Sequence, residues 1–152
     1  MNVSNDTNFD IKAIAQNCGL FGGMDDNLVI SNIDNLKTLY QSSQLVEIYN
    51  YMLSVATEPD VIMHIIRNLD VYRDPSSLEY LVDVLLLKNA NCSDSETKEK
   101  YNNVRVMCAK AIANQKNTDV DSSLLYCMNN KNENYRVRLA CADAIGRIGD
   151  RF

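Results

Sequence analysis

Two segments in the second half of the chain are close copies of each other. The first is Asn103–Ala113, NVRVMCAKAIA, and the second lies within Tyr135–Asp150, YRVRLACADAIGRIGD. At an offset of 33 residues, six of the ten positions from Val104 to Ala113 are identical. Internal repetition at a period of roughly 20 to 50 residues is typical of proteins built from stacked structural units. The pattern therefore predicts a solenoid.

Both copies also carry the apolar spacing of an amphipathic α-helix. The residues that share one face are Val104, Met107, Cys108, Ala111 and Ile112 in the first copy, and Val137, Ala140, Cys141, Ala144, Ile145 and Ile148 in the second. Most of these side chains are small, which favours a close approach of neighbouring helices. Gly146 in the second copy is expected to mark such a close contact.

A second pair of similar segments lies upstream of the first. Ser76–Tyr80, SSLEY, resembles Ser122–Tyr126, SSLLY, at an offset of 46 residues. The order of a capped helix, a connector and an apolar helix thus occurs twice. Because the two offsets differ by 13 residues, the connector of the first copy must be the longer one. The polar segment 89–101, NANCSDSETKEKY, is the predicted connector loop.

The apolar pattern predicts helices along nearly the whole chain, in one domain over residues 9–152. Residues 1–8 are polar and are expected to form a disordered tail. Gly19–Asp26, GLFGGMDD, predicts a helix-ending turn rather than a phosphate-binding loop, because no GK[ST] or GxGxxG motif accompanies its glycines. The predicted divisions are an N-terminal helical cap over 9–42 and helix pairs over 43–70, 74–117 and 120–150.

Charge and hydropathy exclude several classes of partner. The formal net charge is -5, and residues 1–60 hold two Lys against eight Asp and Glu. This balance argues against nucleic-acid binding, which needs a basic surface. We expect no membrane span, because no run approaches the ~20 apolar residues that a span needs. The N-terminus lacks the pattern of a signal peptide, which favours a cytoplasmic location.

The cysteines and the one histidine predict no metal site, no cofactor and no catalytic centre. The five cysteines form no CxxC pair, and His64 has no ligand spacing to any of them. Cys108 and Cys141 occupy equivalent repeat positions beside alanines, which predicts small buried residues in a reducing compartment. Nothing in the sequence supplies His64 with an activating partner, so we expect a binding module rather than an enzyme.

The segment YRVRLACADAIGRIGD resembles the second helix of a HEAT repeat of the short bacterial type called phycobilisome-lyase-like. The resemblance implies antiparallel helix pairs stacked into a right-handed α-solenoid, with the second helices on the concave side. It also implies a scaffold that binds a protein or peptide partner through that side. The family name suggests an alternative function, a bilin-lyase-like or chaperone-like factor that handles a tetrapyrrole prosthetic group.

This chain departs from the family pattern in two places. The family has an aspartate shortly before the VR dipeptide, where it bonds the arginine of a neighbouring repeat. Here Asn132–Asn134 and Asn102–Asn103 stand there, which predicts a weakened ladder of such bonds. The chain stops at Phe152, where the family begins its next repeat. We expect either a fragment of a longer repeat protein, which we favour, or self-association through the C-terminal helix pair.

Charged residues flank the apolar faces of both copies and are the candidates for partner binding. Arg136, Asp143 and Arg147 fall on one ridge, with Asp143 and Arg147 at a spacing that permits an ion pair. Stacked helices would join this ridge to Asn103, Lys110 and Asn114 in one polar strip. The strip is either a site for an acidic peptide or protein, or an ordinary solvated surface. The candidate site residues are Arg105, Lys110, Asn114, Arg136, Arg138, Asp143 and Arg147.

Overall fold

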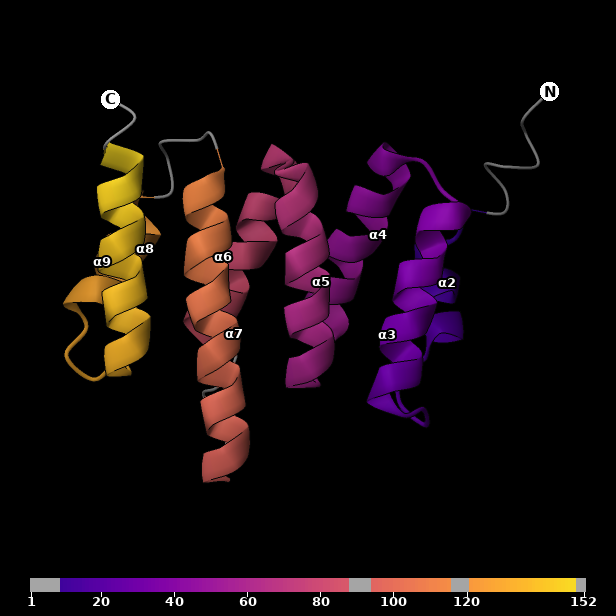
Figure 1. Cartoon of the computed structure of the whole chain (residues 1–152), viewed down its shortest axis with the longest axis horizontal. Coiled ribbons are helices and arrows are strands. Elements are labelled where there is room, and N and C mark those ends of the chain that lie inside the picture. Colours follow the sequence, from indigo (N-terminus) through magenta and orange to yellow (C-terminus); the bar gives the residue numbers. More distant parts are fainter. Residues whose placement is uncertain (1–8, 88–93, 116–120, 150–152) are drawn as a thin grey trace.

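The structure, a computed structural model, consists of helices packed side by side in two rows (Figure 1). It describes residues 9–87, 94–115 and 121–149. These contain eight α-helices, two 3-10 helices and no strand, so the predicted all-α class is confirmed for them. The front row holds α3 (Asp26–Asn35), α5 (Pro59–Tyr72), α7 (Ser95–Asn114) and α9 (Tyr135–Gly149). The back row holds α2 (Ile11–Cys18), α4 (Ser42–Val55), α6 (Leu78–Leu87) and α8 (Asp121–Asn129).

The chain alternates between the two rows, so that all front helices run in one direction and the back helices run in the other (Figure 1). Two 3-10 turns, Leu36–Thr38 and Pro75–Ser77, lead from a front helix to the next back helix. Each front helix packs on its neighbours in the front row as well as on the preceding back helix. The front helices are therefore close enough for their polar side chains to form one continuous strip.

Local sequence explains where most helices begin and end. The carboxylate of Asp10 accepts the N–H of Ala13 at 3.2 Å and begins α2. Gly19 ends that helix with a φ of 96°, in the left-handed region that favours glycine. A Cβ on Gly19 would lie 2.6 Å from the sulfur of Met24, so a larger residue would also displace that side chain. Pro59 opens α5, where its missing N–H breaks no helical bond.

The core lies between the two rows and is continuous from one end of the described chain to the other. Ile62, Ile65, Ile66 and Leu69 of the central helix α5 are fully buried. Burial of one such side chain stabilises a fold by about 1.5 to 3 kcal/mol. The interior is thus one cluster of buried side chains to which all the α-helices contribute.

The predicted connector over 89–101 is wrong from Ser95 onward. Helix α7 begins there, because the carboxylate of Asp94 accepts the N–H of Thr97 at 2.8 Å and its hydroxyl at 2.7 Å. The following Glu and Lys residues are good helix formers whose polarity suits a solvated helix. The first turns of α7 accordingly project beyond the other front helices (Figure 1). The predicted tail over 1–8 lies outside the described residues.

Four cysteines are buried with free thiols, among them Cys108 and Cys141 as predicted, while Cys92 lies outside the described residues. Cys127 of α8 and Cys141 of α9 lie together between their helices. A hydrogen bond to the Cys127 thiol, reinforced by burial, raises the pKa of Cys141. Burial alone raises the pKa of Cys18. Thiols with raised pKa values are poor nucleophiles at neutral pH, so Cys18 and Cys141 serve packing.

Across the described ranges, no helix combines the length and the apolar character that crossing a membrane requires.

Candidate functional site

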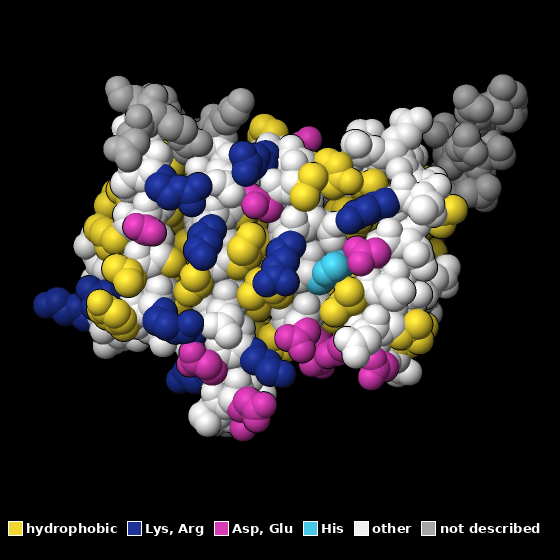
Figure 2. Space-filling model, in the orientation of Figure 1, with side chains coloured by type: hydrophobic (Ala, Val, Ile, Leu, Met, Phe, Trp, Pro, Cys, Tyr) yellow, Lys and Arg dark blue, Asp and Glu magenta, His cyan; other side chains and the backbone are white. Residues whose placement is uncertain are grey.

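The exposed and half-buried polar side chains of the front row form a surface that we call the charged face. Figure 2 shows Lys and Arg side chains spread across this face, with acidic side chains between them. The face is assembled from four helices that lie far apart in the sequence. Its members from the four front helices are Asp34, His64, Arg67, Asp70, Lys100, Asn103, Lys110, Asn114, Arg136, Asp143 and Arg147.

A line of hydrogen bonds joins three front helices near their C-terminal ends. The amide of Asn114 in α7 donates to a carboxylate oxygen of Asp70 in α5 at 2.9 Å. Arg147 of α9 donates to the amide oxygen of Asn114 at 2.7 Å. Asn114 therefore links its two neighbours in register. The structure thus brings Asn114 and Arg147 together, as the polar strip predicted from the repeat requires.

A second contact repeats this arrangement near the N-terminal ends of α7 and α9. The guanidinium of Arg136 donates to the side-chain oxygen of Asn103 at 2.7 Å and also pairs with Glu99. Arg136 and Arg147 thus each bind the asparagine that lies 33 residues earlier in the chain. The predicted ion pair between Asp143 and Arg147 is absent from the described residues. Arg147 is turned to Asn114 instead, so Asp143 remains exposed to solvent.

A groove of about 350 Å³ lies on the charged face where α3, α5 and α7 meet. Half-buried apolar side chains, Ile30 and Met63, line it together with the fully buried Val104. His64, Arg67 and Lys100 also line it, and Arg67 forms no ion pair within the described residues. Lys100 lies 3.8 Å from the carboxylate of Asp60. The groove lining therefore combines apolar surface with two cations, Arg67 and Lys100, and one acid, Asp60.

His64 has a partner that the sequence did not reveal. Its Nε2 lies 2.7 Å from a carboxylate oxygen of Asp34, which belongs to α3. The two residues are 30 positions apart on different helices, and no local spacing relates them. The lining residues of the groove beside them include no Ser, Thr or Cys. The geometry of the pair suits a contact that holds α3 against α5.

Arg105 is misplaced among the predicted partner-binding residues, because only 2% of its side chain is exposed. Its Nε donates to the carbonyl of Leu85 at 2.7 Å, and its two terminal nitrogens bind both carboxylate oxygens of Glu133. Such a two-pronged pair has the geometry of a strong charge-assisted contact. Arg105 thus fastens α6 to the start of α9. A partner cannot reach it.

The arginine ladder was predicted to be weak, and at this position the prediction is wrong. Glu133 takes the part that the resemblance assigns to an aspartate before the VR dipeptide. Burial opposes ionisation of Glu133, but hydrogen bonds from Arg105 and from the N–H of Asn134 outweigh it and lower the pKa of the carboxyl.

Arg138 occupies the corresponding place in α9 but points away from the charged face. Its Nε donates to the carbonyl of Met128 at 3.0 Å, as that of Arg105 does to Leu85. Its side chain is only partly buried. Lys110 and Asp143, by contrast, are exposed on the charged face as predicted. The partner-facing candidates are therefore reduced to Lys110, Asn114, Arg136, Asp143 and Arg147.

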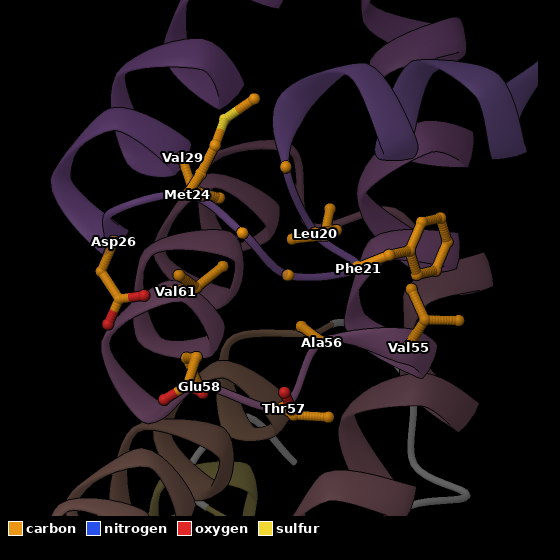
Figure 3. A pocket seen from close by; sticks show the side chains of 13 residues that line it. Leu20, Phe21, Met24, Asp26, Val29, Val55, Ala56, Thr57, Glu58 and Val61 are labelled. Atoms are coloured by element: carbon orange, nitrogen blue, oxygen red, sulfur yellow. The ribbon is translucent and has the colours of Figure 1, made fainter.

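A second hollow, of about 340 Å³, lies under the glycine-rich loop between α2 and α3 (Figure 3). Apolar side chains form part of its wall, among them Leu20, Met24 and Val61. Two carboxylates, Asp26 and Glu58, stand beside them and would repel a phosphate. The chemistry thus agrees with the prediction of a turn rather than a phosphate-binding loop.

Within the described ranges, no three His, Cys, Asp or Glu side chains gather closely enough to hold a metal ion. The charged face with its groove is the candidate functional site. Comparison with protein-family models, with curated proteins and with solved structures finds no match to this chain.

Proposed function

We propose that this chain is a HEAT-like right-handed α-solenoid that acts as a non-enzymatic protein-binding module. In this proposal the charged face is its concave side, and the groove at α3, α5 and α7 captures an acidic segment of a partner. The observation that carries the proposal is the groove itself, where Arg67, His64 and Lys100 surround an apolar floor.

The helix arrangement supports the solenoid part of this proposal. Back and front helices alternate along the chain, and the front helices are parallel neighbours (Figure 1). The contact between Arg105 and Glu133 is the kind of bond between neighbouring units that the resemblance implies. Each unit then touches chiefly the units next to it, as in other repeat proteins.

The chemistry of the groove defines the class of partner. A guanidinium binds a carboxylate through two parallel hydrogen bonds, and Arg67 is the exposed guanidinium there. Met63 and Ile30 offer apolar surface for a neighbouring side chain of the same partner. An extended segment in which acidic and apolar residues alternate would satisfy both features. Arginine is also among the residues that dominate binding energy at protein interfaces.

The polar contacts of the charged face favour a preorganised site. Asn114 ties α5, α7 and α9 together, and the pair of His64 with Asp34 ties α3 to α5. Helices held in this way lose little freedom when a partner binds, which improves affinity. The groove is thus expected to bind without a large rearrangement.

Fluorescence anisotropy with a labelled peptide of alternating Glu and Leu tests the proposal, with a Lys and Leu peptide for comparison. We expect the acidic peptide alone to bind, and higher salt to weaken it. Arg67→Glu should raise the dissociation constant at least ~10-fold, as expected for an interface arginine. Lys12→Glu changes the net charge equally at an exposed position of α2 and serves as the control.

Equal binding of both peptides, or equal effects of the two substitutions, would contradict the proposal. A visible absorbance shift on addition of a tetrapyrrole, without peptide binding, would instead support the alternative of a factor that handles a prosthetic group.

A further inference from the structure

One flank of α7 is covered, while the matching flank of α9 is open. Three pairs of residues, related by the 33-residue offset, show the difference. Asn102 is 3% exposed but Tyr135 is 72% exposed, and Ala109 is fully buried whereas Ala142 is half-buried. Ala113 is 2% exposed, while a Cβ on Gly146 would meet nothing within 4 Å. The predicted close contact at Gly146 is therefore missing.

The two arginines of this flank differ in the same way. Arg105 binds the carbonyl of Leu85 through Nε and the carboxylate of Glu133 through its terminal nitrogens. Arg138 makes the corresponding Nε contact, but its terminal nitrogens bind nothing within the described residues. Arg138 is thus held through its Nε. Its terminal nitrogens remain able to donate to a carboxylate that belongs to a further helix parallel to α9.

The other end of the same row offers a helix with the required features. Helix α3 runs in the same direction as α9 and stands at the opposite end of the front row (Figure 1). Asp25 precedes it, and its carboxylate accepts a backbone N–H at 2.8 Å, as that of Glu133 does before α9. Leu28 is the third residue of α3 and is 50% exposed, whereas Val137, the third residue of α9, is fully buried.

Charge also distinguishes the two ends. Residues 25–35, which comprise α3 and the residue before it, hold three acidic residues and no Lys or Arg, so the α3 end is acidic. The open flank of α9, defined by Tyr135, Arg138, Leu139, Ala142 and Gly146, carries a cation and no acid. Leu139 is 55% exposed there and matches the exposed leucine of α3. The two ends are therefore complementary in charge and both are apolar.

We propose that the open flank of α9 docks the α3 end of a second copy of this chain, head to tail. Arg138 then binds Asp25 of the next copy, and Leu139 packs against its Leu28. The contact continues the stacking of α9 on α7 and uses a surface separate from the charged face. Because the two surfaces differ, repeated contacts generate a ring or an open filament rather than a closed symmetric dimer.

Sedimentation analysis of two variants, each with one end blocked, tests this arrangement. Leu139→Asp blocks the α9 end, and Leu28→Asp blocks the α3 end. We expect the wild type to form larger species as concentration rises, and each variant to stay monomeric. An equimolar mixture of the variants should form dimers and nothing larger, because only one pair of intact ends remains.

Val71→Asp provides the matched control, because Val71 is a 75% exposed apolar residue of α5, away from both ends. It should associate as the wild type does, and thermal unfolding should show all three variants folded. Arg138→Ala should weaken wild-type association at least ~10-fold, as expected for an interface arginine. A wild type that stays monomeric at all concentrations, or a Leu28→Asp variant that still dimerises alone, would overturn the proposal.

Discussion

Helices α7 and α9 carry the same motif but live in different surroundings. The motif of α7 is enclosed by α5, α6 and α9, whereas that of α9 has one flank in solvent. Arg105 is consequently a buried structural residue, whereas Arg138 is half-buried and makes the same contact through Nε. Position in the stack, rather than the motif itself, therefore decides whether the same arginine of the repeat is buried and paired.

Replacement of the two arginines by alanine should give the largest contrast. Arg105→Ala leaves Glu133 and the carbonyl of Leu85 without their buried partner. Loss of one member of a buried pair typically costs about 3 to 5 kcal/mol of unfolding free energy. Arg138→Ala should cost less than ~1 kcal/mol, because its guanidinium is solvated. Urea unfolding followed by circular dichroism measures both, and equal losses would contradict the comparison.

Enlargement of the paired alanines should give a smaller contrast. Ala109→Leu forces a larger side chain into the packed contact between α7 and its neighbours, where Ala109 is fully buried. Overpacking of this kind typically costs about 1 to 3 kcal/mol. Ala142→Leu projects toward solvent and should change stability by less than ~0.5 kcal/mol. Urea unfolding followed by circular dichroism measures both changes, on dilute protein so that a docked second copy does not contribute.

Lowering the pH should weaken the ion pair between Arg105 and Glu133, a pair that Arg138 does not have within the described residues. The pKa of Glu133 is lowered in the folded state, so its ionised form stabilises the fold above the unfolded value of about 4.3. That contribution disappears as pH falls through the lower folded value. The stability difference between wild type and Glu133→Gln should therefore be full at pH ~6 and shrink below about pH 4.

Glu99→Gln is the control for the acid experiment, because Glu99 pairs with Arg136 on the surface and is 57% exposed. It should change the pH dependence of stability much less than Glu133→Gln. Unfolding midpoints measured between pH 6 and 3 test this. A larger change in pH dependence for Glu99→Gln than for Glu133→Gln would contradict the prediction, because it would make the surface pair the stronger one.

The helices themselves could be predicted from the sequence, apart from one boundary. Apolar spacing, Gly19 and Pro59 indicate helix positions through local physics, and the structure agrees with them. The segment after Asp94 was misread because its polarity suits either a loop or a solvated helix. Its decisive feature is the cap that Asp94 supplies, and one carboxylate before a polar run is a weak signal in sequence.

Contacts within the candidate site could be predicted only between residues at equivalent positions of the repeat. The 33-residue offset pairs Asn103 with Arg136 and Asn114 with Arg147, and both pairs are hydrogen-bonded. The pair of His64 with Asp34 joins different helices at no repeating distance, so no pattern could reveal it. The burial of Arg105 was missed because a charged residue beside an apolar face usually lies at the surface.

The sequence by itself determined the helical character of this protein, its repeating unit and the side chains that pack between helices. These properties follow from periodicity and from caps, which act over a few residues. Only the tertiary structure decided that Arg105 is buried and paired while Arg138 is open, and that His64 meets Asp34 in a groove. Those outcomes depend on which helix lies against which, because burial and pairing arise between segments that are distant in the chain.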